Sequence, residues 1–177
     1  VIVSIAGYQR TPQRKLPLRM TSDMTTQNEA TDIAYMRQAL ALAQRAADQG
    51  EVPVGALVVF EDKVIGEGWN QPISTQDPTA HAEVVALRAA ARRLANYRLT
   101  GASLYVTLEP CPMCAGAMVH ARMARVIYGT TDPIAGAAGT VFNVLAAPSL
   151  NHRPVVQGGV LAEECAHGLK SFFQARR

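Results

Sequence analysis

Thr79-Ala80-His81-Ala82-Glu83 is the first of two segments that carry side chains able to bind a metal. The second is Pro110-Cys111-Pro112-Met113-Cys114, in which Cys111 lies 28 positions after Glu83. Together the two segments offer one imidazole, two thiols and a carboxylate. Zinc prefers nitrogen and sulfur ligands in a tetrahedron, and catalytic zinc sites leave one of the four positions to water. His81, Cys111 and Cys114 supply three ligands, and no fourth lies at a comparable spacing. The sequence therefore predicts one zinc ion per chain.

The spacing of these residues predicts two helix beginnings that face each other. Two cysteines at positions i and i+3 share one face of a helix, and Pro112 suits a first helical position. Residues i and i+2 point about 200° apart, so His81 and Glu83 converge only at the first turn of a helix. Asp77-Pro78 is a typical cap and first helical residue, and we expect the helix to begin there. Ala80, Val84, Leu87, Ala91 and Leu94 would form its apolar stripe.

Glu83 is not needed as a metal ligand, so we assign it to proton transfer beside a zinc-activated water. Two other interpretations of the cysteine pair are a structural zinc site and a redox pair. A structural site needs a fourth ligand, for which the candidates are Cys165, His120, His152 and His167. A redox pair leaves the His-x-Glu segment and the two prolines without explanation.

Composition describes an ordinary globular protein of 177 residues, with 49% hydrophobic and 18% charged residues. Three cysteines, two of them assigned to a metal, favour a reducing compartment, and we expect a cytoplasmic location. No apolar run approaches the length of a membrane span. Residues 1–28 lack an apolar stripe and are predicted to be a disordered extension of a single domain, residues 29–177. Residues 120–177 carry a net charge of +3, a weak indication of a nucleic-acid partner.

Apolar periodicity predicts an α/β fold. We expect a helix from about residue 31 to Gly50, and a closing helix over residues 160–175. Strands are expected at 54–60, 63–68, 103–108, 125–129 and 154–156, and a mobile glycine-rich loop at 130–140. In the closing helix, Leu161, Cys165, Leu169 and Phe172 form the buried stripe, which makes Cys165 a core residue and leaves Phe173 on the flank. Alternating helices and strands predict a three-layer α/β/α sandwich with a mixed central sheet of about five strands and a site at strand ends.

The pairing of His-x-Glu with Pro-Cys-x-x-Cys is typical of zinc-dependent nucleobase deaminases. Over residues 33–177 the chain resembles the bacterial tRNA adenosine deaminases of the cytidine/deoxycytidylate deaminase superfamily. The segments that carry the resemblance beyond the zinc motif include Gly66-Glu67-Gly68-Trp69-Asn70, Gly136-Ala137-Ala138-Gly139 and Asn151-His152-Arg153. The resemblance implies a cytidine deaminase-like fold and conversion of the wobble adenosine of a tRNA anticodon stem-loop to inosine. It also implies a homodimer.

The resemblance also implies roles for individual residues. Asn70 and Ala82 would contact the base in the pocket, and Asn151 would add a polar contact near the flipped base. Asp132 and Phe173 fall where the family touches the anticodon loop. The alternatives are a turn-shaping role for Asn70, a loop cap for Asp132 and core packing for Phe173. Pro133 departs from the family pattern and stiffens the loop after Asp132.

Two other functions remain open on the sequence. The first is deamination of a free base or nucleoside, which predicts turnover of cytosine, guanine or a related compound. The second is a non-catalytic, zinc-stabilised RNA-binding module, which predicts bound zinc without turnover.

Overall fold

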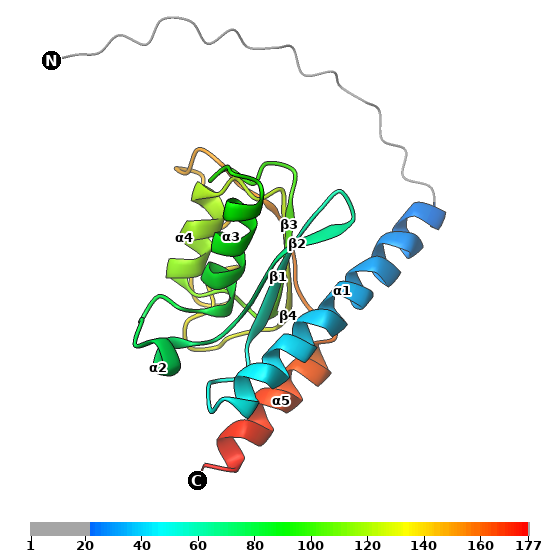
Figure 1. The fold of residues 1–177 in the computed structure, drawn as a ribbon. Helices are drawn as coiled ribbons and strands as arrows, with labels where there is room; N and C mark the ends of the chain where they lie inside the picture. The colour runs from blue at the N-terminus through cyan, green and yellow to red at the C-terminus, as the bar shows by residue number, and fades with distance from the viewer. Residues whose placement is uncertain (1–21, 177) are drawn as a thin grey trace, which may run out of the picture.

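The computed structural model describes residues 22–176, in which a sheet of five strands lies between two helical layers (Figure 1). Helices α1 and α5 cover one face of the sheet, and α3 and α4 cover the other. The helices are α1 (Ser22–Asp48), α2 (Pro72–Thr75), α3 (Ala82–Arg93), α4 (Pro112–His120) and α5 (Ala162–Gln174). The strands are β1 (Gly55–Phe60), β2 (Lys63–Trp69), β3 (Ser103–Leu108), β4 (Arg125–Thr130) and β5 (Val155–Gln157). The predicted three-layer sandwich is confirmed.

The order of strands explains how the two halves of the zinc motif come together. The sheet runs β2-β1-β3-β4-β5, with β1 antiparallel to β2 and β3, and with β4 parallel to both β3 and β5. Parallel strands need a crossover, and α4 supplies it between β3 and β4. The carboxyl end of β3 therefore leads directly into the cysteine segment.

Strand β1 is buried on both faces because each face packs against a helical layer. Leu57 and Val59 join Met36 of α1 in one apolar cluster, whereas Ala56 and Val58 join the cluster under α3 and α4. This two-sided burial accounts for the uninterrupted apolar run of β1.

Helix α3 approaches β2 very closely because glycine and alanine meet at the contact. A Cβ atom on Gly68 would lie 2.2 Å from the carbonyl oxygen of Ala82, and one on Gly66 would lie 2.4 Å from that of Ala86. The buried face of α3 is accordingly Ala82, Glu83, Ala86, Leu87 and Ala90. Of the predicted stripe, Ala80 and Leu87 are buried, and Val84 and Ala91 pack against the same cluster while partly exposed. Leu94 was wrong because it is exposed, and the centre of the buried face is shifted to the small residues Ala82, Ala86 and Ala90.

Two predicted helix boundaries also differ from the structure. Helix α3 begins at Ala82 and not at Asp77-Pro78, since the Asp77 carboxylate accepts hydrogen bonds from the N–H and hydroxyl of Thr79 and so closes a separate turn. Helix α1 begins at Ser22 instead of near residue 31. Its early turns need only backbone hydrogen bonds to propagate, so no apolar stripe marks them. The remainder of the predicted extension, residues 1–21, lies outside the described residues.

Helix α5 agrees with its predicted stripe. Cys165 and Phe172 are buried, and Phe173 is 50% exposed on the flank of the helix. Between residues 22 and 176, no helix combines the length and apolar character that crossing a membrane requires.

The close contact between β2 and α3 predicts that Gly68→Ala destabilises the protein by about 1–3 kcal/mol, because the added methyl group overlaps the backbone of α3. Gly116→Ala in α4 is the matched control. A Cβ atom there meets nothing within 4 Å, and alanine is the better helix former by about 1 kcal/mol. Denaturant midpoints of the two variants measure the difference. An equal effect in both would contradict the tight contact.

Candidate active site

Each half of the zinc motif has a ligand residue immediately before the first residue of a helix. His81 is the N-cap of α3, and Cys111 is the N-cap of α4, each with extended backbone angles. Pro112 occupies the start of α4, as predicted. Because a helix begins immediately after each residue, the side chains of His81 and Glu83 converge at the end of α3. The two helix beginnings therefore meet with their functional side chains between them.

The three predicted ligands form one compact group. The Nδ1 atom of His81 lies 3.7 Å from the Sγ atom of Cys111 and 3.6 Å from that of Cys114, and all three ligand atoms lie within 4.8 Å of one another. Tetrahedral zinc, with bonds of about 2.1 Å to nitrogen and about 2.3 Å to sulfur, separates such atoms by about 3.6 Å. His81, Cys111 and Cys114 are thus positioned to hold one zinc ion.

Among the alternative fourth ligands, Cys165 is excluded by its position. It lies in the apolar cluster between the sheet and helices α1 and α5, whereas Cys114 belongs to the cluster on the opposite face. In the part of the chain that the structure describes, the group of side chains that could hold a metal consists of His81, Cys111 and Cys114, and includes none of the other three histidines. A tetrahedral zinc ion held by these three ligands would keep a position for water, as in catalytic zinc sites.

The pKa values of the two ligand thiols are shifted in opposite directions because the thiols are hydrogen-bonded to each other. A hydrogen bond from Cys114, helped by the neighbouring His81 and opposed by burial, lowers the pKa of Cys111 to about 4. The same hydrogen bond, together with burial, raises the pKa of Cys114. These opposite pKa shifts belong to the pair, in which the thiol of Cys114 donates a hydrogen bond that stabilises the thiolate of Cys111. Metal binding displaces the remaining proton, since zinc binds the thiolate form.

Glu83 lies beside this group without belonging to it. Its side chain is 4% exposed, and burial is the main cause that raises the pKa of its carboxyl to about 7. Nearby Cys111 acts in the same direction, whereas a hydrogen bond from the Glu83 backbone and the charge of His81 oppose it. It lines the same cavity as His81 and Cys111. A carboxyl group in this position is available to accept and return protons.

The cavity at the zinc group has a volume of about 290 Å³. Apolar walls come from Val52, Val54 and Leu108, and the polar side chains Asn70, Glu109 and Asp132 reach the same space. A partly apolar cavity with a few fixed polar groups is typical of sites for small molecules.

The predicted base contacts Asn70 and Ala82 touch each other. The Asn70 side-chain oxygen accepts a hydrogen bond of 2.9 Å from the backbone N–H of Ala82, which is itself fully buried. Asn70 lines the cavity, whereas Ala82 contributes through the start of α3. Asn70 therefore fixes the first turn that carries His81 and Glu83.

Asp132 lines the catalytic cavity, and Phe173 lies next to it. Phe173 lines an adjoining cavity of about 380 Å³, which shares Val52, Leu108 and Asp132 with the first. The Asp132 carboxylate also accepts hydrogen bonds from the N–H groups of Ile134 and Ala135, so it caps the turn that contains Pro133. The structure thus brings both residues to the adjoining cavity, and Asp132 has a local structural role as well.

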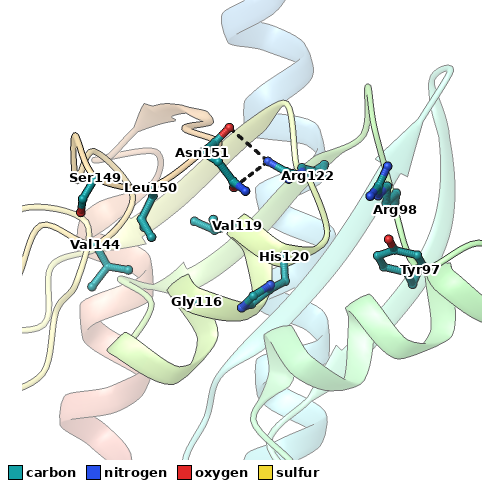
Figure 2. Close-up of a pocket in the computed structure, with 10 residues that line it drawn as sticks. All are labelled: Tyr97, Arg98, Gly116, Val119, His120, Arg122, Val144, Ser149, Leu150 and Asn151. Carbon is teal, nitrogen blue, oxygen red and sulfur yellow. Dashed lines mark hydrogen bonds between the residues drawn. The ribbon is translucent and has the colours of Figure 1, made fainter. Parts of the chain in front are cut away.

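Asn151 lies elsewhere. Figure 2 shows it hydrogen-bonded to Arg122 in a separate cavity at the end of α4, and the described residues lining this cavity and the catalytic one have none in common. The structure does not bring Asn151 to His81 and Glu83.

Glu109 was missed as a site residue. It is 2% exposed, and its carboxylate accepts hydrogen bonds from the N–H groups of Asp132, Ala138 and Thr140 and from the Thr140 hydroxyl. Burial raises the pKa of this carboxyl, but these hydrogen bonds outweigh burial and hold it below its ordinary range. These hydrogen bonds hold the loop at 130–140, which was predicted to be mobile, beside the catalytic cavity. A carboxylate at the end of a buried strand was the available signal.

Glu109→Gln should loosen this loop, because hydrogen bonds to a charged acceptor contribute about 1.5–3 kcal/mol. The NH2 group of glutamine would also face N–H or O–H groups of the loop, with which it cannot form the hydrogen bonds that the carboxylate accepts. We expect backbone amides of Asp132, Ala138 and Thr140 to exchange with solvent roughly tenfold faster or more. Glu67→Gln, at an exposed position of β2, is the control. Unchanged protection in Glu109→Gln would contradict the anchoring role.

Cys111→Ser and Cys114→Ser should each lose zinc and stability, because removing one of three protein ligands leaves the other two facing each other without a metal. Cys165→Ser should retain one zinc ion per chain, since Cys165 lies in the other cluster. Atomic absorption after gel filtration measures the content. Zinc retained by both ligand variants would place the metal elsewhere.

Comparison with known proteins agrees with this geometry. Residues 29–130 match the family of the cytidine and deoxycytidylate deaminase zinc-binding region. The chain is 51% identical over 147 residues to the tRNA-specific adenosine deaminase of Haemophilus influenzae, covering 82% of this chain and 85% of the relative. It is 44% identical over 146 residues to that of Bacillus subtilis, covering 82% and 91%.

A solved structure from work on A-to-I editing by tRNA:A34 deaminases superimposes with a TM-score of 0.75 at 41% identity, covering 77% of this chain and 99% of that one. The zinc group, the fold and these identities lead to one assignment. The chain is a zinc-dependent deaminase that belongs to the tRNA-specific adenosine deaminase family.

Proposed function

We propose that this protein catalyses the hydrolytic deamination of adenosine to inosine at the wobble position of a tRNA anticodon. The observation that carries the proposal is the position of Glu83. It is buried at the zinc group, lies outside the ligand set, and lines the cavity that a base would enter. The identity of the chain to tRNA-specific adenosine deaminases supports adenosine in tRNA as the substrate.

When bound, zinc lowers the pKa of a coordinated water to about 7 and so supplies a nucleophile at neutral pH. Glu83 accepts a proton from the attacking water and delivers it to the ring nitrogen of adenine that is bonded to C6, while the water oxygen bonds to C6. It then carries the second water proton to the amino group as the bond from C6 to nitrogen breaks. One water is consumed and one ammonia is released, and Glu83 returns to its starting state.

The neighbouring residues bind and orient the base. Val52, Val54 and Leu108 enclose its faces, and Asn70 stands at the rim with its side-chain oxygen fixed by Ala82. An adenine must leave the stack of the anticodon loop to enter, which is easier from a loop than from a duplex. The adjoining cavity offers Phe173, half exposed, as a stacking surface for a neighbouring base.

The protein is further proposed to act as a cytoplasmic homodimer. The support for the homodimer is helix α4, in which nearly every residue is apolar although only Cys114, Ala115, Met118 and Val119 are buried. Its outer side, with Met113 exposed, is an apolar surface that a second copy would cover.

Glu83→Gln tests the proposal. We expect at least a 10²–10⁴-fold loss of inosine formation, because proton transfer is removed while the shape of the side chain is kept. Zinc content should stay near one ion per chain, since Glu83 is not in the ligand group. Nucleoside analysis of a digested anticodon stem-loop with a wobble adenosine measures the product.

Free adenosine, cytosine and guanine, and a stem-loop with guanosine at the wobble position, are the substrate controls. Turnover of a free base with no turnover of the stem-loop would replace the proposed function by a free-base deaminase. Bound zinc with no turnover of any substrate would favour the non-catalytic RNA-binding module.

A further inference from the structure

One wall of the catalytic cavity has no apolar core to hold it in place. Asn70 and Pro72 line the cavity, and both belong to residues 70–74, the α2 wall. None of the four residues of α2 is buried, and no other helix or strand within residues 22–176 packs against this helix (Figure 1). Burial of apolar surface therefore does not set the position of the α2 wall, and hydrogen bonds must do so.

A buried carboxylate makes one of these hydrogen bonds. Glu51, which lies between α1 and β1, is 2% exposed, and its Oε1 atom accepts a hydrogen bond of 2.7 Å from the backbone N–H of Ser74. Ser74 is the third residue of α2, where a helix supplies no carbonyl partner for the N–H group. The N-cap residue, Gln71, makes no side-chain hydrogen bond to the helix. Glu51, 23 residues earlier in the chain, thus does the work of a capping side chain.

Glu51 is itself held firmly by the end of α1. Gly50 has φ of 81°, its N–H donates to the carbonyl of Ala47, and the N–H of Glu51 donates to the carbonyl of Ala46. These two bonds form the helix-ending motif in which a glycine takes the left-handed position. The next residue, Val52, lines the catalytic cavity. The same corner of the chain therefore supplies both a wall of the cavity and the carboxylate that reaches α2.

Two further hydrogen bonds join this corner to the residues before α2. The indole N–H of Trp69 donates to the side-chain oxygen of Gln49 at 2.9 Å, and the backbone N–H of Asn70 donates to the carbonyl of Val54 at 3.0 Å. These bonds hold the α2 wall where it leaves β2, and the Glu51 carboxylate holds it within α2. A charged acceptor forms a stronger hydrogen bond than a neutral one, so the Glu51 bond is the stronger of the two attachments.

We propose that Glu51 is a positioning residue for the deamination, which keeps the α2 wall in the place where the base binds. Glu51 belongs neither to the metal group nor to the residues that line the cavity, so it acts through the wall and not on the reacting atoms. The inference deepens the proposed function and rests on it. A wall that is released would occupy the binding position for only part of the time, and the apparent affinity would fall by that fraction.

The test compares Glu51→Met with Glu51→Gln. Methionine keeps an unbranched side chain of similar length but offers no oxygen to Ser74, whereas glutamine keeps an uncharged oxygen acceptor. Asp48→Asn is the matched control, because this exposed carboxylate near the end of α1 accepts its hydrogen bond from Gln44 of the same helix. Steady-state kinetics on the stem-loop with a wobble adenosine, zinc content and amide exchange at Ser74 are measured for each protein.

We expect Glu51→Met to raise KM about tenfold, while kcat at saturating RNA stays within about twofold of wild type. Zinc content should stay near one ion per chain, since Glu51 is outside the metal group. The N–H of Ser74 should exchange with solvent about tenfold faster or more, because its acceptor is lost. Glu51→Gln should return KM to within about threefold of wild type. Asp48→Asn should behave as wild type in every measurement.

Three results would overturn the inference while the wild-type enzyme converts the stem-loop and the proposed function stands. The first is a wild-type KM in Glu51→Met. The second is a fall in kcat without a rise in KM, which would mean that Glu51 affects the chemical step. The third is an equal rise of KM in Glu51→Gln and Glu51→Met, which would trace the effect to the negative charge and not to the hydrogen bond that holds α2.

If Glu51→Met does not fold, amide exchange in the wild-type protein decides. The N–H of Ser74 should then exchange at least about tenfold more slowly than an unprotected amide, although the residue is exposed. Unprotected exchange would show that the carboxylate does not hold the α2 wall.

Failure of the proposed function gives a different pattern. If the wild-type protein turns over a free base and not the stem-loop, the proposed function fails, and the inference stands when Glu51→Met raises KM for that base. No turnover of any substrate by the wild-type protein would overturn both.

Discussion

The meeting of two helix beginnings is the constraint on which the rest of this structure depends. A zinc ion needs its ligand atoms within a few ångströms, yet His81 and Cys111 are 30 residues apart in the chain. The fold brings them together because each is the residue immediately before a helix, α3 in one case and α4 in the other. Glycines in β2 let α3 come close enough to the sheet for this meeting, and β3 delivers the cysteine segment to the same edge.

This constraint also decides what surrounds the metal. The end of α3 carries Glu83 into a buried position, where the carboxyl gains a pKa near neutrality from burial. Glu109 follows the end of β3, and its carboxylate accepts hydrogen bonds from the backbone of the loop that contains Asp132. The roles of Glu83 and Glu109 therefore differ because the groups around their carboxylates differ. Glu109 has all its hydrogen bonds taken by the loop, whereas Glu83 faces the cavity beside the zinc group.

The sequence was sufficient for features that depend on local pattern. Strand positions followed from apolar runs, the zinc ligands followed from residue type and spacing, and the exposure of Phe173 followed from helical phase. It was insufficient where tertiary contacts choose between local solutions. Asp77 closes its own turn instead of capping α3, Gly66 and Gly68 select the alanine face of α3, and Glu109 orders a loop that reads as mobile. The position of Asn151 in a second cavity depends on its contact with Arg122, which no spacing reveals.

The central claim is that zinc has three protein ligands and one open position, with Glu83 nearby but unbound. X-ray absorption at the zinc edge of the purified protein tests it most directly. The account predicts two sulfur ligands at about 2.3 Å, one imidazole nitrogen at about 2.0–2.1 Å and one further light atom from solvent. In Glu83→Gln the same shell should be seen. A third sulfur, a second imidazole, or a light-atom ligand that disappears in Glu83→Gln would contradict the account.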